Sequence, residues 1–103
     1  MVDEPPVYDV VLTPSFLADL EACVCYVGEA LGSPLAARRI YETIRKKVEG
    51  LKILPTAASS YISPSTGSRR YRISYGKYDI YYLVDEERLR VVVLGIKHQL
   101  QCA

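Results

Sequence analysis

The side chains best suited to chemistry lie in the C-terminal third of the chain. Arg69, Arg70 and Arg72 stand close together in the segment Arg-Arg-Tyr-Arg, and His98 is the one histidine in the sequence. Arginine forms forked hydrogen bonds with phosphate or carboxylate groups, and imidazole titrates near neutral pH and can act as a general base. An exposed charged strand with a surface histidine would have the same sequence. The pattern therefore indicates either an anion-binding site with one proton carrier or a solvated strand.

The distribution of charge also separates this third from the rest. Residues 1–68 contain six Lys/Arg against eight Asp/Glu, whereas residues 69–103 contain seven against four. A basic excess suits nucleic acid or an acidic protein segment, and equally a solvated sheet face. A second group of cations suits nucleic-acid phosphates or a solvated helix face. It consists of Arg38, Arg39, Arg45, Lys46 and Lys47.

Tyrosine is concentrated in the same region as the arginines. Five of the nine tyrosines fall within residues 71–82. Tyrosine rings can stack on nucleic-acid bases, or they can pack in a core and at a protein interface. Alternation along the expected strand places Tyr81 and Leu83 on the side away from the helices. There they would form an apolar strip for a protein partner or a second copy.

The cysteines predict no metal centre. Cys23, Cys25 and Cys102 form no Cys-x-x-Cys pair, and a single histidine accompanies them. On the predicted helix Cys23 and Cys25 would point about 200° apart and could not easily share one metal ion, so we expect no metal and no cofactor. Reduced thiols are typical of the cytoplasm.

Length and composition predict one globular domain over residues 1–103. Half of the residues are hydrophobic and 24% are charged, which is typical of a packed domain of this size. The longest apolar run, residues 91–96, is far shorter than the roughly 20 residues that span a bilayer. Residues 1–6 are acidic and proline-rich, unlike a secretory signal. We expect a cytoplasmic protein with an extended or disordered segment 1–6, a tail at 99–103 and no membrane contact.

The first half of the chain predicts a strand followed by two helices. The valine-rich residues 7–12 are typical of a strand buried on both sides. Apolar residues then recur every three or four positions, which predicts one helix that is capped by Thr13 or Ser15 and ends at Gly32. Ser33 and Pro34 begin a second amphipathic helix, which Pro55 closes. The short connection makes the two helices an antiparallel hairpin.

The second half predicts a loop and a three-stranded meander. Residues 56–68 contain serine, proline and glycine without periodicity, which is typical of a surface loop. Strands are then expected at 69–74, 78–84 and 88–97, the last of them internal because both of its faces are apolar. The fold class is α+β, in the order β-α-α-β-β-β, with a helical hairpin packed on a small, mainly antiparallel sheet. The pattern does not determine whether the first strand pairs with the last.

This order of elements, together with several local motifs, resembles the RelE/ParE superfamily of toxins from type II toxin–antitoxin modules. The matching pieces cover nearly the whole chain from about residue 7. They are Ala-Ala-Arg at 36–38, Leu-Lys-Ile-Leu-Pro at 51–55, Arg-Arg-Tyr-Arg-Ile at 69–73, Tyr-Asp-Ile-Tyr-Tyr-Leu-Val at 78–84 and the valine-rich strand with its histidine at 91–98.

The resemblance implies one of two activities. RelE-like members are endoribonucleases that cut mRNA on the ribosome, whereas ParE-like members share the fold, cut nothing and poison DNA gyrase. Both are held inactive by an antitoxin, which implies an antitoxin partner for this chain, alone or in a heterotetramer, and a homodimer is a further possibility. Antitoxin or target would bind Arg69, Arg70, Arg72, Tyr81 and Leu83.

Two departures from the nuclease pattern favour the ParE-like activity. By resemblance, Arg70 and Arg72 match the basic pair of the nucleases, and His98 matches a functional Arg or His. These residues would catalyse metal-free RNA cleavage. However, Asp79 replaces the arginine of the middle strand, and the tail lacks the terminal tyrosine. The leading interpretation is a toxin that binds gyrase. The alternatives are an mRNA endonuclease and a non-toxic interaction module.

Overall fold

A computed structural model describes residues 6–98 and contains one five-stranded sheet in the order β1-β5-β4-β3-β2. Of the predicted N-terminal segment 1–6, residues 1–5 lie outside the described residues, and so does the predicted tail 99–103 with Cys102. The strands are β1 (Asp9–Leu12), β2 (Ser59–Ile62), β3 (Arg69–Tyr75), β4 (Tyr78–Asp85) and β5 (Arg90–His98).

The sheet is antiparallel except for one pair. Strand β1 runs parallel to β5, with Val10 opposite Val91, while β2, β3, β4 and β5 form antiparallel neighbours. This arrangement confirms the predicted α+β fold, and it places the first strand beside the last. β5 is internal, as expected from its two apolar faces.

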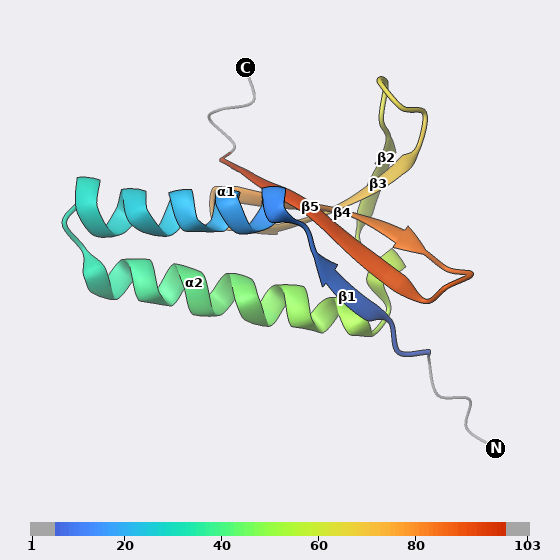
Figure 1. The fold of residues 1–103 in the computed structure, drawn as a ribbon, viewed down its shortest axis with the longest axis horizontal. Coiled ribbons are helices and arrows are strands. Elements are labelled where there is room, and N and C mark those ends of the chain that lie inside the picture. Colours follow the sequence, from blue (N-terminus) through green and yellow to red (C-terminus); the bar gives the residue numbers. More distant parts are fainter. Residues whose placement is uncertain (1–5, 99–103) are drawn as a thin grey trace.

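Two helices form the predicted hairpin, α1 (Pro14–Cys25) and α2 (Pro34–Glu49), and they lie side by side and antiparallel (Figure 1). Thr13 caps α1, because its Oγ1 accepts a hydrogen bond from the Phe16 amide at 3.2 Å. Ser33 caps α2 in the same way, with the Ala36 amide at 3.3 Å. Proline at the first helical position suits both starts.

The expectation of one uninterrupted α-helix ending at Gly32 was wrong. The last part of the first helix is a π-helical segment, η1 (Tyr26–Ala30), and it closes with a hydrogen bond from the Leu31 amide to the Tyr26 carbonyl at 3.2 Å. A π-turn contains one more residue than an α-turn, and the apolar periodicity does not distinguish the two over so short a segment. Gly32 then reverses the chain with φ +65°.

Two strand predictions were also wrong. The expected loop at 56–68 contains β2, which pairs with β3 although all four of its side chains are exposed. An edge strand without a buried face has no hydrophobic alternation to reveal it. Strand β1 is partly buried on one side, through Val10 and Leu12, and exposed on the other, because it too is an edge strand and the helices cover a single face of the sheet.

The core lies between the helices and that one face. Phe16 and Leu20 of α1 and Ile44 and Val48 of α2 are buried against the sheet. The sheet contributes Ile80, Tyr82, Val91, Val93 and Ile96. The Tyr82 hydroxyl donates a hydrogen bond to the Pro55 carbonyl at 2.6 Å, and burial raises the pKa of Tyr82 to about 12. This bond ties the chain after α2 to the central strand.

A β-bulge in β5 changes which of its residues face the core. Tyr81 pairs with Gly95 but Tyr82 pairs with Val93, so Leu94 is the extra residue. The Asp19 carboxylate accepts a hydrogen bond from the Ile96 amide at 2.9 Å. A Cβ atom on Gly95 would lie 2.7 Å from the same carboxylate oxygen. Glycine at this position therefore lets α1 hold the bulge. Among residues 6–98, no helix is long and apolar enough to cross a bilayer.

Candidate functional site

Strand β3 presents Arg70 and Arg72 on the face of the sheet that the helices leave uncovered. Tyr71, Ile73 and Tyr75 pack against the core, so the side chains between them point to the opposite side. Arg72 is exposed, and the Nε atom of Arg70 is buried without a hydrogen-bond partner among the described residues. The structure therefore brings the two arginines of the predicted anion site together.

Aromatic and cationic side chains from other strands surround this pair. Arg72 lies opposite Tyr81, and Arg70 lies opposite Tyr61. The Tyr61 and Tyr81 rings meet edge to face at 6.1 Å, and Lys97 Nζ lies 5.6 Å from the Tyr81 ring centroid. Leu83 follows on the same side of β4, opposite Val92. We call this surface the open face. Its residues are Tyr61, Arg70, Arg72, Tyr81, Leu83 and Lys97.

Two members of the open face were missed by sequence reasoning. Tyr61 lies on β2, within the segment that was expected to be a loop, so no strand alternation indicated its direction. Lys97 follows the bulge in β5, so its direction depends on a register shift that the sequence does not show. The one signal in the sequence that could have indicated Lys97 is its positive charge near the end of the last predicted strand.

Arg69 differs in position from the other two arginines of the segment. Its Nη1 donates a hydrogen bond to the Ser60 hydroxyl at 2.8 Å. Alternation along β3 directs its side chain to the side opposite Arg70. Arg69 thus links β3 to the edge strand β2, and it does not belong to the open face.

Asp79 places a carboxylate at the end of the open face. It is buried, it lies across from Lys97, and it accepts a hydrogen bond from the Ser74 hydroxyl at 2.6 Å. Alternation along β4 puts Asp79 on the same side as Tyr81. The Asp79 carboxylate therefore lies on this side of the sheet, at the position where the RelE-like nucleases that the sequence resembles have an arginine.

His98 lies on the other side of the sheet from Arg70 and Arg72. Its ring meets the Tyr78 ring edge to face at 5.2 Å, and Tyr78 packs against the core. His98 also lines a cleft with Asp19 and Cys23 of α1. The structure thus separates the predicted histidine from the predicted arginine pair, and the catalytic role of the three residues stays a prediction.

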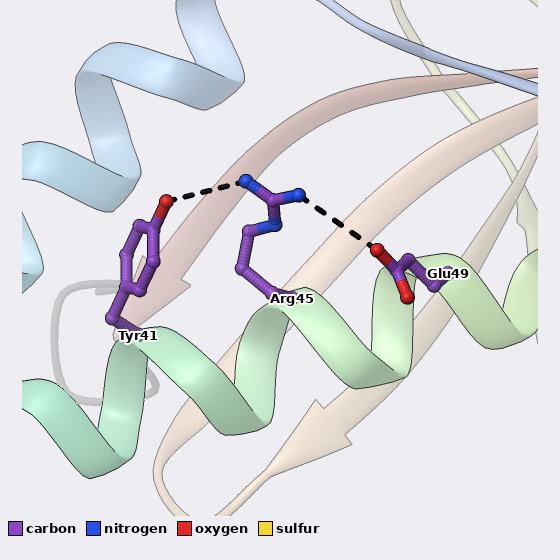
Figure 2. A network of polar contacts seen from close by, with 3 residues as sticks. All are labelled: Tyr41, Arg45 and Glu49. Atoms are coloured by element: carbon purple, nitrogen blue, oxygen red, sulfur yellow. Dashed lines mark hydrogen bonds and ion pairs between the residues drawn. The ribbon is translucent and has the colours of Figure 1, made fainter.

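The cations of α2 are partly neutralised along their own helix. Arg38 Nε lies 3.6 Å from a Glu42 carboxylate oxygen. Figure 2 shows Arg45 between Tyr41 and Glu49: its guanidinium donates to the Tyr41 hydroxyl at 3.2 Å and lies 3.7 Å from the Glu49 carboxylate. The hydrogen bond that Arg45 donates to the Tyr41 hydroxyl is the main cause that raises the pKa of Arg45. All of these pairs are exposed, which is typical of a solvated helix face.

The described residues offer no evident metal site. Within residues 6–98, no three His, Cys, Asp or Glu side chains come together as a group that could hold a metal ion. Cys23 is half-buried and Cys25 is exposed, and both are free thiols.

Comparison with known proteins decides the family. The family model of the ParE toxin of the type II toxin–antitoxin system parDE matches residues 10–101. The chain belongs to this toxin family. No curated protein sequence matches the chain significantly.

Solved structures share the fold of this ParE-family toxin. The toxin–antitoxin complex RelBE2 from Mycobacterium tuberculosis contains a chain with 20% identity and a TM-score of 0.65, with 94% of this chain and 97% of that chain covered. The chromosomal ParDE system from P. aeruginosa gives 18% identity and a TM-score of 0.69, with coverages of 89% and 96%. The archaeal RelE–RelB complex from Pyrococcus horikoshii OT3 gives 18% identity and a TM-score of 0.63, with 90% of this chain and 96% of that chain covered. At these identities the likeness shows the fold alone.

Proposed function

We propose that this ParE-family toxin inhibits growth by binding DNA gyrase, without cleaving RNA, and that an antitoxin neutralises it. The observation that carries the proposal is the separation of the residues a nuclease would need. Arg70 and Arg72 lie on the open face, whereas His98 lies on the helix side of the sheet against Tyr78. A proton carrier on the opposite side of a sheet cannot reach a phosphate held by the arginines.

The charge at Asp79 supports the same conclusion. RNA cleavage builds negative charge on the phosphate, and catalysis depends on cations aimed at that charge. A buried carboxylate on the same side of β4 as Tyr81 would oppose that charge, because electrostatic interactions are stronger where water is excluded. Such a surface can still bind a protein.

The composition of the open face suits a protein interface. Tyrosine and arginine are enriched in the residues that contribute most to protein binding. The buried Nε atom of Arg70 has no partner among the described residues, and a bound carboxylate or carbonyl would supply one. We therefore assign antitoxin or target binding to the open face, including the predicted residues Arg70, Arg72, Tyr81 and Leu83. Arg69 contributes through its support of β2. The three structural neighbours come from toxin–antitoxin complexes or systems, which agrees with an antitoxin partner for this chain.

Two assays on the intact chain test the proposed target. The purified protein should inhibit supercoiling by gyrase, and primer extension after induced expression should find cellular mRNA intact. Normal supercoiling together with cleaved messages would overturn the proposal. An Arg70→Ala/Arg72→Ala variant should lose inhibition, whereas the matched control Arg38→Ala/Arg39→Ala on α2 should retain it.

The second candidate function is ribosome-dependent mRNA cleavage, and the proximity of Arg70, Arg72 and Lys97 on one face favours it. A nuclease that uses the predicted residues would lose toxicity with either His98→Ala or Arg72→Ala. The gyrase proposal expects His98→Ala to remain toxic. Induced expression of the two variants therefore separates the candidates.

A further inference from the structure

A cleft on the helix side of the sheet has a distinctive set of polar and aromatic groups. Its volume is about 380 Å³, and it lies between α1 and the ends of β4 and β5. The lining consists of Asp19, Ala22, Cys23, Tyr26, Tyr78, Ile96 and His98. The proposed binding of gyrase through the open face does not use this cleft.

Aromatic rings form much of its wall. Tyr78 and His98 meet at an interplanar angle of 87° with centroids 5.2 Å apart. Tyr26 is 58% exposed, so it stands at the rim rather than within the core. The faces of aromatic rings attract cations, and several rings around one cavity form a site for an organic cation.

Asp19 supplies a negative charge to the same cleft. One carboxylate oxygen accepts the Ile96 amide hydrogen at 2.9 Å, and no ion pair joins Asp19 to a cation within residues 6–98. Burial raises the pKa of the Cys23 thiol, and the Asp19 charge raises it further. The Asp19 carboxylate places a negative charge in the wall of the cleft, and a half-buried carboxylate without a cation gains from binding one.

We propose that this cleft binds the guanidinium group of an arginine side chain from a protein partner. A guanidinium stacks on aromatic rings and donates paired hydrogen bonds to a carboxylate, which matches the two kinds of group present. The exposed Tyr26 ring at the rim favours a protein as the source, because tyrosine is enriched where proteins meet. The site lies on the opposite side of the sheet from the open face, so this contact is independent of the proposed gyrase target.

Titration of the full-length protein with a model peptide tests the proposal by NMR. The probe is acetyl-Gly-Arg-Gly-amide, and its control is the same peptide with citrulline, which has nearly the same shape without the charge. The arginine peptide should shift the Gly95 and Ile96 amide signals saturably, and the citrulline peptide should bind at least about tenfold more weakly, as expected when a charged hydrogen bond is lost. Equal binding of both peptides, or the absence of saturable shifts, would overturn it.

Variants assign the binding to the cleft. Asp19→Asn removes the charge but keeps an oxygen that can accept the hydrogen bond from the Ile96 amide. It should weaken the binding of the arginine peptide by about tenfold. The matched control Asp9→Asn, on exposed β1, should leave binding unchanged. If Asp19→Asn fails to fold, Tyr26→Ala carries the test, because Tyr26 is exposed and its loss should weaken binding without unfolding. Unaltered binding in the folded Asp19 and Tyr26 variants would refute the assignment.

Discussion

Substitution of Gly95 by alanine tests how α1 holds the bulge in β5. The new Cβ atom would lie 2.7 Å from Asp19 Oδ2, the atom that accepts the Ile96 amide hydrogen at 2.9 Å. The aspartate side chain can rotate away, but it then gives up this hydrogen bond. The cost of the substitution is therefore close to the value of the bond.

The magnitude follows from two opposing contributions. A hydrogen bond to a charged group contributes about 1.5–3 kcal/mol, whereas replacing glycine by alanine recovers about 0.5–1 kcal/mol of unfolded-state entropy. We expect a net loss of about 0.5–2.5 kcal/mol, which corresponds to a fall in Tm of about 2–20 °C for a domain of this size. Thermal unfolding followed by circular dichroism measures it.

A double-mutant cycle isolates the contact. Gly95→Ala should cost little in an Asp19→Ala background, because no carboxylate is left to displace, so the two effects should be less than additive. Gly50→Ala is the matched control: its Cβ would meet nothing within 4 Å, and its Tm should not fall. Full additivity, or a Gly95→Ala variant with the Tm of the native protein, would refute the reasoning.

Three further predictions concern buried or capped groups. Tyr82→Phe removes the 2.6 Å hydrogen bond to the Pro55 carbonyl and should cost about 1–2 kcal/mol in urea unfolding at neutral pH. Because burial raises the pKa of Tyr82 to about 12, the unfolded chain ionises first. This residue's stabilisation is therefore complete below pH of about 10 and is lost between about pH 10 and 12, and Tyr82→Phe should reduce that alkaline decline. An equal alkaline decline in both proteins would contradict this. Thr13→Ala removes the cap of α1 and the 2.7 Å bond to the Val93 carbonyl, and it should lower stability by about 1–2 kcal/mol, whereas Thr13→Ser should restore most of the loss. A serine variant as unstable as the alanine variant would count against the cap. In a Cys102→Ser background, Cys25 should react with a disulfide reagent faster than Cys23, because burial and the Asp19 charge raise the pKa of the Cys23 thiol. Faster labelling of Cys23, found by mass spectrometry, would contradict this.

Much of the fold could be predicted because its determinants are local. Thr13 with Pro14 and Ser33 with Pro34 mark the helix starts, and their caps are formed as expected. The alternation in residues 69–74 and 78–84 predicted β3 and β4, together with the common face of Arg70 and Arg72. The edge strands were harder to predict. β2 has no buried face, and β1 owes its half-exposure to its position beside β5, which depends on residues about 80 positions away.

The location of His98 shows what the sequence alone could not determine. Strict alternation along β5 from the buried Val91 and Val93 would direct residue 98 to the open face, beside the arginines. The bulge at Leu94 inserts one residue, so Ile96 and His98 face the helices instead. That register is held by a contact between Asp19 of α1 and the Ile96 amide, 77 positions apart. Local patterns thus determined the helix starts, the inner strands and the arginine pair, whereas the bulge that a long-range hydrogen bond holds decided which side of the sheet carries the histidine.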